Sequence, residues 1–128
     1  LLYPVTDLQL KKVSIEECAE GFFLTKVAME WFRKHYLNSL DEMTDPLISP
    51  LLAENLSNLP PAVVSTAGFD PLRDEGNEYA DRLKSSGNKV FLLENQGFIH
   101  GFANMGYIPG VEKVLNEICI ELKEMMES

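Results

Sequence analysis

The fold is decided by residues 62–94, which read AVVSTAGFDPLRDEGNEYADRLKSSGNKVFLLE. Residues 62–67 are β-branched and almost continuously apolar, as in a strand that is covered on both faces of a parallel sheet. Residues 89–94 predict another strand, and residues 71–86, between the two, predict a helix. Strands separated by a helix imply parallel pairing with a right-handed crossover.

Local signals mark both ends of this helix. Asp70 is suited to the N-cap and Pro71 to the first helical position, while Asp74 and Glu75 favour the positive end of the helix dipole. Gly87 then ends the helix. Asp70 therefore follows directly on a strand, at the carboxyl edge of the sheet, where the sites of open parallel sheets lie.

The flanking segments extend this arrangement in both directions. Residues 1–5 are apolar and predict a short buried strand, and residues 109–128 predict a terminal amphipathic helix. Residues 25–38 predict a helix that begins at a capping threonine. The segment before it, 6–20, is irregular, and the segment after it, 39–61, predicts a loop with at most short helical turns. The sequence thus predicts an α/β protein with three parallel strands, flanking helices and a long insertion after the first strand.

The composition excludes several kinds of partner. A net charge of −9 argues against nucleic acids and anionic membranes, because little is available to neutralise phosphates. No apolar run approaches the ~20 residues that cross a bilayer, so we expect no membrane span. Cys18 and Cys119 lie far apart without the spacing of a metal site. Free thiols in a reducing cytoplasm are expected, with a disulfide as the alternative.

One pair of residues is suited to acid–base chemistry. Asp70 and His100 follow neighbouring predicted strands, so the βαβ unit brings them to the same edge of the sheet. A carboxylate that faces one imidazole nitrogen fixes the tautomer of the histidine, and the other nitrogen can then take a proton from a hydroxyl. Gly97 and Gly101 permit the tight loop that this placement of His100 requires.

These residues carry a family resemblance. Residues 67–76 (AGFDPLRDEG) and 97–102 (GFIHGF) resemble the two C-terminal signatures of the hormone-sensitive-lipase-like esterases, which are α/β hydrolases of family 3. Residues 2–4 resemble the strand that follows the nucleophile helix of that family. Residues 21–51 resemble its second cap segment, so the resemblance covers essentially the whole chain.

The resemblance implies a carboxylesterase or lipase-type serine hydrolase that acts on small carboxylic esters without a metal or organic cofactor. Asp70 would be the acid and His100 the base of a Ser-His-Asp triad. Residues 1–128 would form a partial α/β-hydrolase domain whose segment 6–61 includes the cap insertion. Within the cap helix, Trp31 and Phe32 are the candidates for lining the substrate pocket.

Two parts of the family pattern are absent. The chain has no Gly-x-Ser-x-Gly elbow for the nucleophile and no His-Gly-Gly-type loop for the oxyanion hole. It also opens on an apolar strand-like run without a methionine. We therefore expect the C-terminal part of an esterase, inactive alone and completed by a missing N-terminal half.

Other interpretations remain open for individual residues. Asp70 could serve as a helix N-cap, His100 could be a loop histidine with a structural hydrogen bond, and Asp74 is the rival triad acid. Trp31 and Phe32 could pack in the core instead of meeting a ligand. His35, elsewhere on the cap helix, is expected at the surface or in cap packing.

A second function is also open, that of a non-catalytic remnant that acts in self-association or partner binding. Strand 1–5 lacks a neighbour on one side, and its unpaired backbone groups need a cover. A homo-oligomer would supply one, through this edge or through strand 89–94 and the terminal helix. A stand-alone nucleotide-binding protein is excluded, because no glycine-rich phosphate loop follows any predicted strand.

Overall fold

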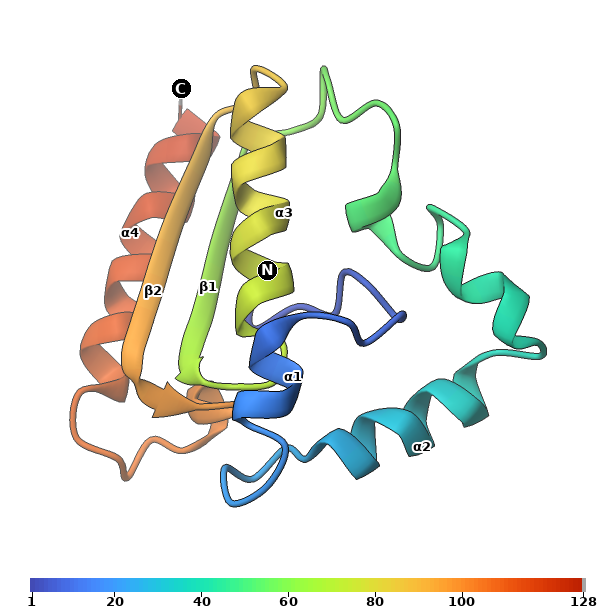
Figure 1. Ribbon diagram of the computed structural model, residues 1–128. Helices are drawn as coiled ribbons and strands as arrows, with labels where there is room; N and C mark the ends of the chain where they lie inside the picture. The colour runs from blue at the N-terminus through green and yellow to red at the C-terminus, as the bar shows by residue number, and fades with distance from the viewer. Residues whose placement is uncertain (128) are drawn as a thin grey trace.

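The computed structural model describes residues 1–127, which form an α/β arrangement of two strands and flanking helices. Figure 1 shows the two strands side by side, with a long helix on each face of the pair. The elements in chain order are α1 (Val13–Glu17), α2 (Lys26–Tyr36), the 3₁₀ turns η1 (Leu40–Thr44) and η2 (Pro50–Leu52), β1 (Ala62–Phe69), α3 (Arg73–Ser85), β2 (Val90–Ile99), the 3₁₀ turn η3 (Phe102–Asn104) and α4 (Val111–Glu127).

The parallel pair β1 and β2 confirms the fold class. The register runs from Ala62 opposite Val90 to Ala67 opposite Asn95, and all of β1 except its two end residues is buried. An irregularity after Ala67 lets β2 continue beyond the predicted strand end, to Ile99. Gly68 is required there, because a Cβ atom at this position would lie 2.2 Å from the backbone oxygen of Gln96.

The third predicted strand, residues 1–5, is reduced to a single bridge. Leu2 pairs in parallel with Ser65 of β1, and the Tyr3 N–H donates to the Ser65 oxygen at 2.7 Å. The pairing stops there because Tyr3 has a positive φ of 35°, which turns the chain away, and Pro4 has no N–H to continue the ladder. The sheet of three strands predicted from the sequence is therefore a sheet of two strands with one attached bridge.

The start of α3 also differs from the prediction. The helix begins at Arg73 with Leu72 as its N-cap, so Asp70 is not the capping residue. Instead, the Leu72 N–H donates to Oδ1 of Asp70 at 2.9 Å, and the Arg73 N–H donates to the Asp70 backbone oxygen at 3.1 Å. These bonds form a turn between β1 and α3. The turn fixes one carboxylate oxygen of Asp70 and leaves the other available.

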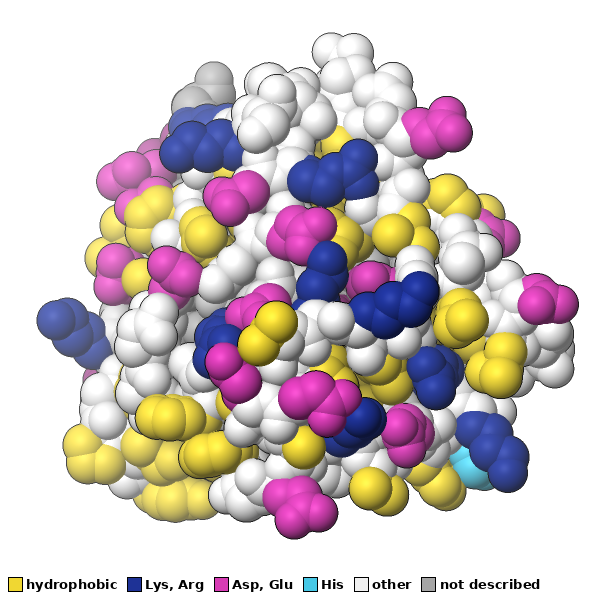
Figure 2. Space-filling model, in the orientation of Figure 1, with side chains coloured by type: hydrophobic (Ala, Val, Ile, Leu, Met, Phe, Trp, Pro, Cys, Tyr) yellow, Lys and Arg dark blue, Asp and Glu magenta, His cyan; other side chains and the backbone are white. Residues whose placement is uncertain are grey.

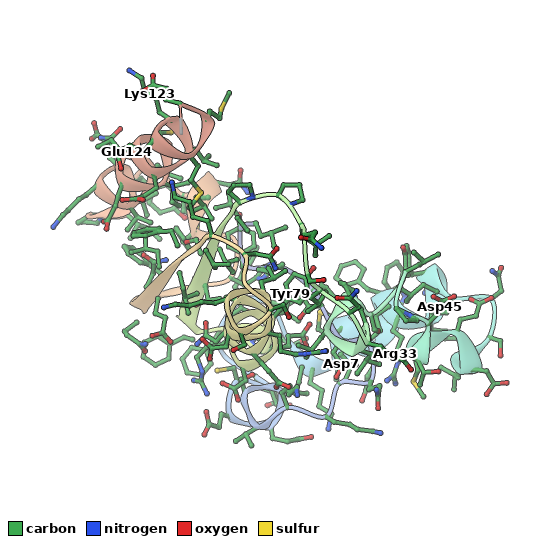
Figure 3. All side chains as sticks on the ribbon, turned by 90° about the horizontal axis from the view of Figure 1, so that it is seen from above. Asp7, Arg33, Asp45, Tyr79, Lys123 and Glu124 are labelled. Carbon is green, nitrogen blue, oxygen red and sulfur yellow. The ribbon has the colours of Figure 1, made fainter. Side chains whose placement is uncertain are left out.

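The insertion 6–61 is more ordered than the sequence indicates. The predicted cap at Thr25 is confirmed, since its hydroxyl accepts from the Ala28 N–H. The segment predicted to be irregular, 6–20, contains α1, in which Ser14 and Ile15 are buried. Seen from above (Figure 3), the side of the molecule that carries Arg33 and Asp45 lies opposite α4.

Two groups of buried side chains hold the layers together. One joins the insertion to the start of α3 and contains Leu10, Ile15, Met29 and Leu72. The other lies between β1 and α4, around Phe102, Ala67 and Val111. Both groups border the carboxyl ends of the strands, so the edge of the sheet that carries Asp70 and His100 is packed from two sides.

The surface is predominantly charged where α1 and α3 face outward. Figure 2 shows acidic and basic side chains intermingled over this face and hydrophobic side chains gathered near the loop that follows β2. Across residues 1–127, each helix is too short or too polar to cross a bilayer.

Candidate active site

Asp70 and His100 meet where β1 and β2 end. The Nδ1–H of His100 donates to Oδ2 of Asp70 at 2.9 Å, which fixes the tautomer because a carboxylate can only accept. Asp70 is 1% exposed, whereas the His100 side chain keeps 22% of its surface. Gly101, with φ of 80°, turns the chain directly after His100. The ring thus has one nitrogen fixed on a buried carboxylate and the other, Nε2, free to exchange a proton.

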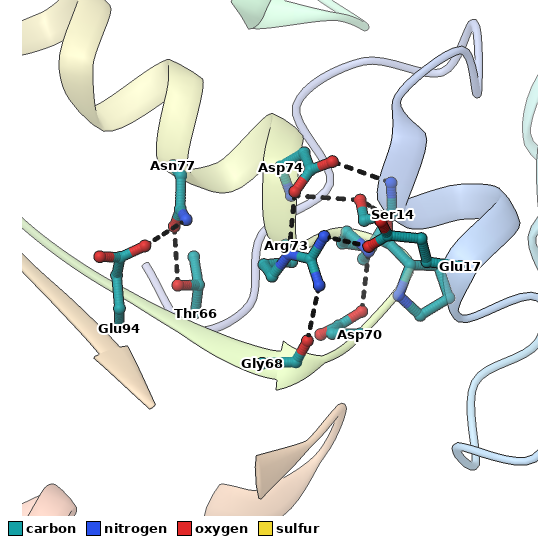
Figure 4. Close-up of polar contacts among 11 residues, drawn as sticks. Ser14, Glu17, Thr66, Gly68, Asp70, Arg73, Asp74, Asn77 and Glu94 are labelled. Atoms are coloured by element: carbon teal, nitrogen blue, oxygen red, sulfur yellow. Dashed lines mark hydrogen bonds and ion pairs between the residues drawn. The ribbon is translucent and has the colours of Figure 1, made fainter. Parts of the chain in front are cut away.

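An arginine fixes the turn that carries Asp70. Arg73 donates to the Gly68 carbonyl at 3.0 Å and pairs with Glu17 of α1 and with Asp74 of its own helix (Figure 4). The contact to Gly68 reaches back across the turn to the end of β1. The position of Asp70 is therefore fixed from both the strand and the helix.

Asp74, the alternative acid, faces a different part of the molecule. Its Oδ2 accepts from the Ser14 N–H at 2.8 Å and its Oδ1 from Nε of Arg73 at 2.9 Å, as Figure 4 shows. The Ser14 hydroxyl oxygen accepts from the Asp74 N–H at 3.2 Å. Oδ2 of Asp74 therefore joins α1 to α3, Oδ1 binds an arginine of its own helix, and the carboxylate beside His100 is that of Asp70.

A pocket of about 590 Å³ opens between α2 and His100. Its lining is largely apolar and consists of Val5, Leu8, Leu24, Met29, Phe32, Arg33, His35, Tyr36, Ile48, Leu72 and His100. Of the two residues predicted to line the pocket, Phe32 does line it. Trp31 is not part of the lining and stacks on His35, with ring centroids 4.0 Å apart.

The alternative that Trp31 and Phe32 pack in the core is wrong for this chain, because they are 56% and 52% exposed. The apolar side chains of α2 are covered only in part, since Met29 is buried against Leu10, Ile15 and Leu72 whereas Trp31 and Phe32 lie at the surface. His35 is exposed, and its Nδ1 lies 2.8 Å from the Trp31 backbone oxygen, which confirms its predicted surface position.

Two residues near the site, Tyr3 and Glu75, were not identified from the sequence as part of its chemistry. Tyr3 packs its ring on His100, with centroids 4.5 Å apart. Glu75 is fully buried, and its Oε1 accepts from the backbone N–H groups of Thr6 and Asp7 at 2.6 and 3.0 Å, while Oε2 has no hydrogen-bond partner among residues 1–127. Burial raises the pKa of Glu75 to about 7. The only sequence signal for Glu75 was its place in the first helical turn. That position favours an acidic residue in any helix, including one at the surface, and so does not indicate burial.

Among residues 1–127, no three acidic, histidine or cysteine side chains come together as a metal site requires. The polar groups that meet at the strand ends are the carboxylate of Asp70 and the imidazole of His100, with the ring of Tyr3 packed on the imidazole. Such a set suits proton transfer more directly than metal binding.

Comparisons with known proteins agree with this architecture. The family model of the alpha/beta hydrolase fold matches residues 1–104. The carboxylic ester hydrolase LipN of Mycobacterium tuberculosis is 46% identical over 111 residues, which are 86% of this chain and 30% of the relative.

Solved structures of esterases are also similar to this chain. A thermostable esterase from Pseudomonas putida superposes with a TM-score of 0.87 at 38% identity, over 91% of this chain and 38% of the other. A hyperthermophilic esterase from the archaeon Pyrobaculum calidifontis superposes with a TM-score of 0.92 at 36% identity, over 100% of this chain and 43% of the other.

The chain spans between 30% and 43% of the length of these relatives. Over that length the family match and the structural similarity agree with the resemblance stated from the sequence. The chain belongs to the α/β-hydrolase fold family and is similar to the hormone-sensitive-lipase-like esterases within it.

Proposed function

We propose that this chain supplies the acid and the base of a carboxylic ester hydrolase. The observation that carries the proposal is the 2.9 Å hydrogen bond from His100 Nδ1 to the buried Asp70, at the mouth of an apolar pocket. The names of the relatives, a carboxylic ester hydrolase and two esterases, support the same chemistry. The nucleophilic serine and the oxyanion donors would come from the N-terminal half of the hydrolase.

The reaction follows from the tautomer of His100. Its Nε2 removes the proton from the serine hydroxyl while the serine oxygen attacks the ester carbonyl. The imidazolium then gives that proton to the departing alkoxide, and an acyl-enzyme remains. A water molecule, deprotonated by Nε2, then attacks the acyl carbon, the bond to the serine oxygen breaks, and the imidazolium returns its proton to that oxygen as the acid leaves. Asp70 stabilises the imidazolium in both halves without leaving the turn after β1.

The substrate would be a small carboxylic ester with an apolar arm. The pocket beside His100 has mostly aliphatic and aromatic walls, to which Phe32 contributes one ring. We propose that segment 6–61 provides this wall as part of a cap. Trp31 would contact only a larger substrate, because it lies outside the pocket and stacks on His35.

A chimeric enzyme tests the proposal. The matching segment of the Pseudomonas putida esterase is replaced by this chain, so that the host supplies the serine and the oxyanion hole. We expect the chimera to hydrolyse p-nitrophenyl acetate, whereas the chain alone stays at the background rate. The chain lacks the elements that supply most of the rate, since an oxyanion donor alone contributes roughly 10²–10³ in kcat.

Two results would contradict the proposal. Turnover by the isolated chain that disappears in His100→Ala would place a nucleophile within these residues. A folded chimera without activity would favour the alternative function of a non-catalytic module that acts in self-association or partner binding. Circular dichroism of the chimera separates this second result from simple misfolding.

We also propose that the isolated chain self-associates. Leu1, Leu2 and Val5 are exposed at 55%, 39% and 43% beside the single-bridge edge of the sheet. In the complete hydrolase the N-terminal half would cover them; in its absence a second copy of the chain is the available cover. Light scattering is expected to give a mass above that of the monomer, and a monomeric mass at moderate concentration would exclude this association.

The cytoplasm is the compartment we propose. Both cysteines are free thiols, Cys18 buried and Cys119 exposed. An exposed thiol persists most readily where glutathione and thioredoxin keep thiols reduced.

A further inference from the structure

Tyr3 lies against the imidazole of His100 on a strained stretch of backbone. The ring centroids are 4.5 Å apart with the planes inclined by 55°. The tyrosine ring also meets Phe102 in a T-shaped contact with centroids 5.6 Å apart, and Phe102 is fully buried. The imidazole therefore contacts an aromatic ring that is itself supported by the core.

The backbone of Tyr3 is held in an unfavourable conformation. Its φ of 35° lies in the left-handed region, which costs a residue with a Cβ atom of order 1–3 kcal/mol. Two contacts hold the backbone there. The Tyr3 N–H donates to Ser65 of β1 at 2.7 Å, and Pro4 packs beside Gly76 of α3, where a Cβ atom would lie 3.6 Å from the proline ring. Strain that is fixed on both sides of one residue indicates that its side-chain direction matters.

We propose that Tyr3 is a positioning residue for His100, whose ring it holds in the plane that aims Nε2 at the substrate pocket. The inference rests on the proposed function, since it assigns a role in that reaction. Asp70 fixes one ring nitrogen but leaves the ring free to tilt about the Nδ1–Oδ2 line. The tyrosine ring restricts this tilt, because aromatic faces in contact prefer a few offset or inclined arrangements.

The phenol itself does no acid–base work in this arrangement. Burial raises the pKa of Tyr3, and the nearby charge of Asp70 raises it further. The hydroxyl therefore remains protonated, and its contribution is the ring. Tyr3→Phe should consequently behave as the wild type, which a role for the hydroxyl would forbid.

The first test uses the isolated chain and needs no activity. Long-range ¹H–¹⁵N NMR correlations of His100 are compared among the wild type, Tyr3→Phe, Tyr3→Ala and Tyr3→Gly. Alanine keeps the backbone strain without the ring, and glycine removes both. We expect Tyr3→Phe to retain a protected Nδ1 proton, and both Tyr3→Ala and Tyr3→Gly to exchange it about tenfold faster. Tyr3→Leu replaces the alanine variant should that variant fail to fold.

The second test measures kcat and KM in the chimera. We expect Tyr3→Ala to lower kcat about tenfold with KM unchanged and Tyr3→Phe to restore the wild-type value. Tyr107→Ala is the matched control, since Tyr107 is 83% exposed, and should change neither constant. Unchanged proton exchange and kcat in Tyr3→Ala, or an equal loss in Tyr3→Phe, would overturn the inference. An inactive wild-type chimera would refute the proposed function instead, and the NMR comparison would still decide the role of Tyr3.

Discussion

The Glu75→Gln variant is expected to lack the fall in unfolding free energy that Glu75 causes as the pH rises, which is the largest pH-dependent contribution to the stability of this chain. Burial, partly offset by two backbone hydrogen bonds and reinforced by Asp7 and Asp70, raises the pKa of Glu75 from 4.5 to about 7. The folded state therefore binds this proton more tightly than the unfolded state does. Stability from this group is greatest below pH 4.5 and falls as the pH rises towards 7.

The expected size follows from the shift. A change of this extent corresponds to a loss of about 3 kcal/mol of unfolding free energy between pH 4.5 and neutrality. Above pH 7 the loss levels off, because Glu75 is then ionised in both states. Glutamine keeps an oxygen for the N–H groups of Thr6 and Asp7 but has no charge to desolvate.

Urea unfolding at a series of pH values measures this difference. The free energy of the wild type relative to Glu75→Gln should fall with pH across the window, whereas Glu124→Gln, on the exposed side of α4, should run parallel to the wild type. A Glu75→Gln curve that also runs parallel to the wild type would show that Glu75 titrates normally and that its buried Oε2 has a partner.

The second large effect is expected at the two residues that define the site. In the chimera, His100→Ala removes the base and Asp70→Asn removes the charge that fixes the tautomer. A change of the latter kind lowers kcat by about 10⁴ in serine hydrolases with this triad, and we expect a loss of that order for each variant. The double variant should lose little more than either single one, because the residues act as one unit.

His35→Ala is the matched control for this experiment. His35 also lines the pocket but is exposed and hydrogen-bonded to the Trp31 carbonyl, so its removal should leave kcat nearly unchanged. A loss of activity in His35→Ala comparable to that in His100→Ala would mean that the wrong histidine has been assigned. Retained activity in Asp70→Asn would transfer the acid role to another carboxylate.

The pairing of Asp70 with His100 could be predicted from the sequence because it depends on topology. Each residue follows a strand, and parallel neighbours bring such residues to one edge. The cap at Thr25 was predictable for a similar reason. Its hydroxyl accepts from the N–H of Ala28, three residues later, so the interaction is local in the sequence. Both features depend on chain neighbours or on strand order alone.

The contacts of Tyr3 and Glu75 could not be predicted in the same way. The ring of Tyr3 meets a histidine 97 residues away in the sequence, and the backbone at Tyr3 has a positive φ that an apolar strand-like run does not indicate. Glu75 resembles any acid in a first helical turn until Thr6 and Asp7 are placed over it. Helix α1 is similar, because its buried Ser14 depends on Asp74, far along the sequence.

Helix α2 was predicted from the sequence, but the exposure of its apolar side chains was not, because periodicity alone does not say what covers them. Trp31 and Phe32 are exposed in this chain, and only Phe32 borders the pocket. The bridge at Leu2 has the same cause, since an apolar run predicts a strand without saying how far its neighbour follows it.

The most direct test of the central claim is the tautomer of His100 in the isolated chain, at a pH where the imidazole is neutral. The hydrogen bond to Asp70 predicts a long-range ¹H–¹⁵N pattern with the proton on Nδ1 and an unprotonated Nε2, and Asp70→Ala should abolish this preference. A wild-type spectrum with the proton on Nε2, unchanged in Asp70→Ala, would show that the carboxylate does not orient the base.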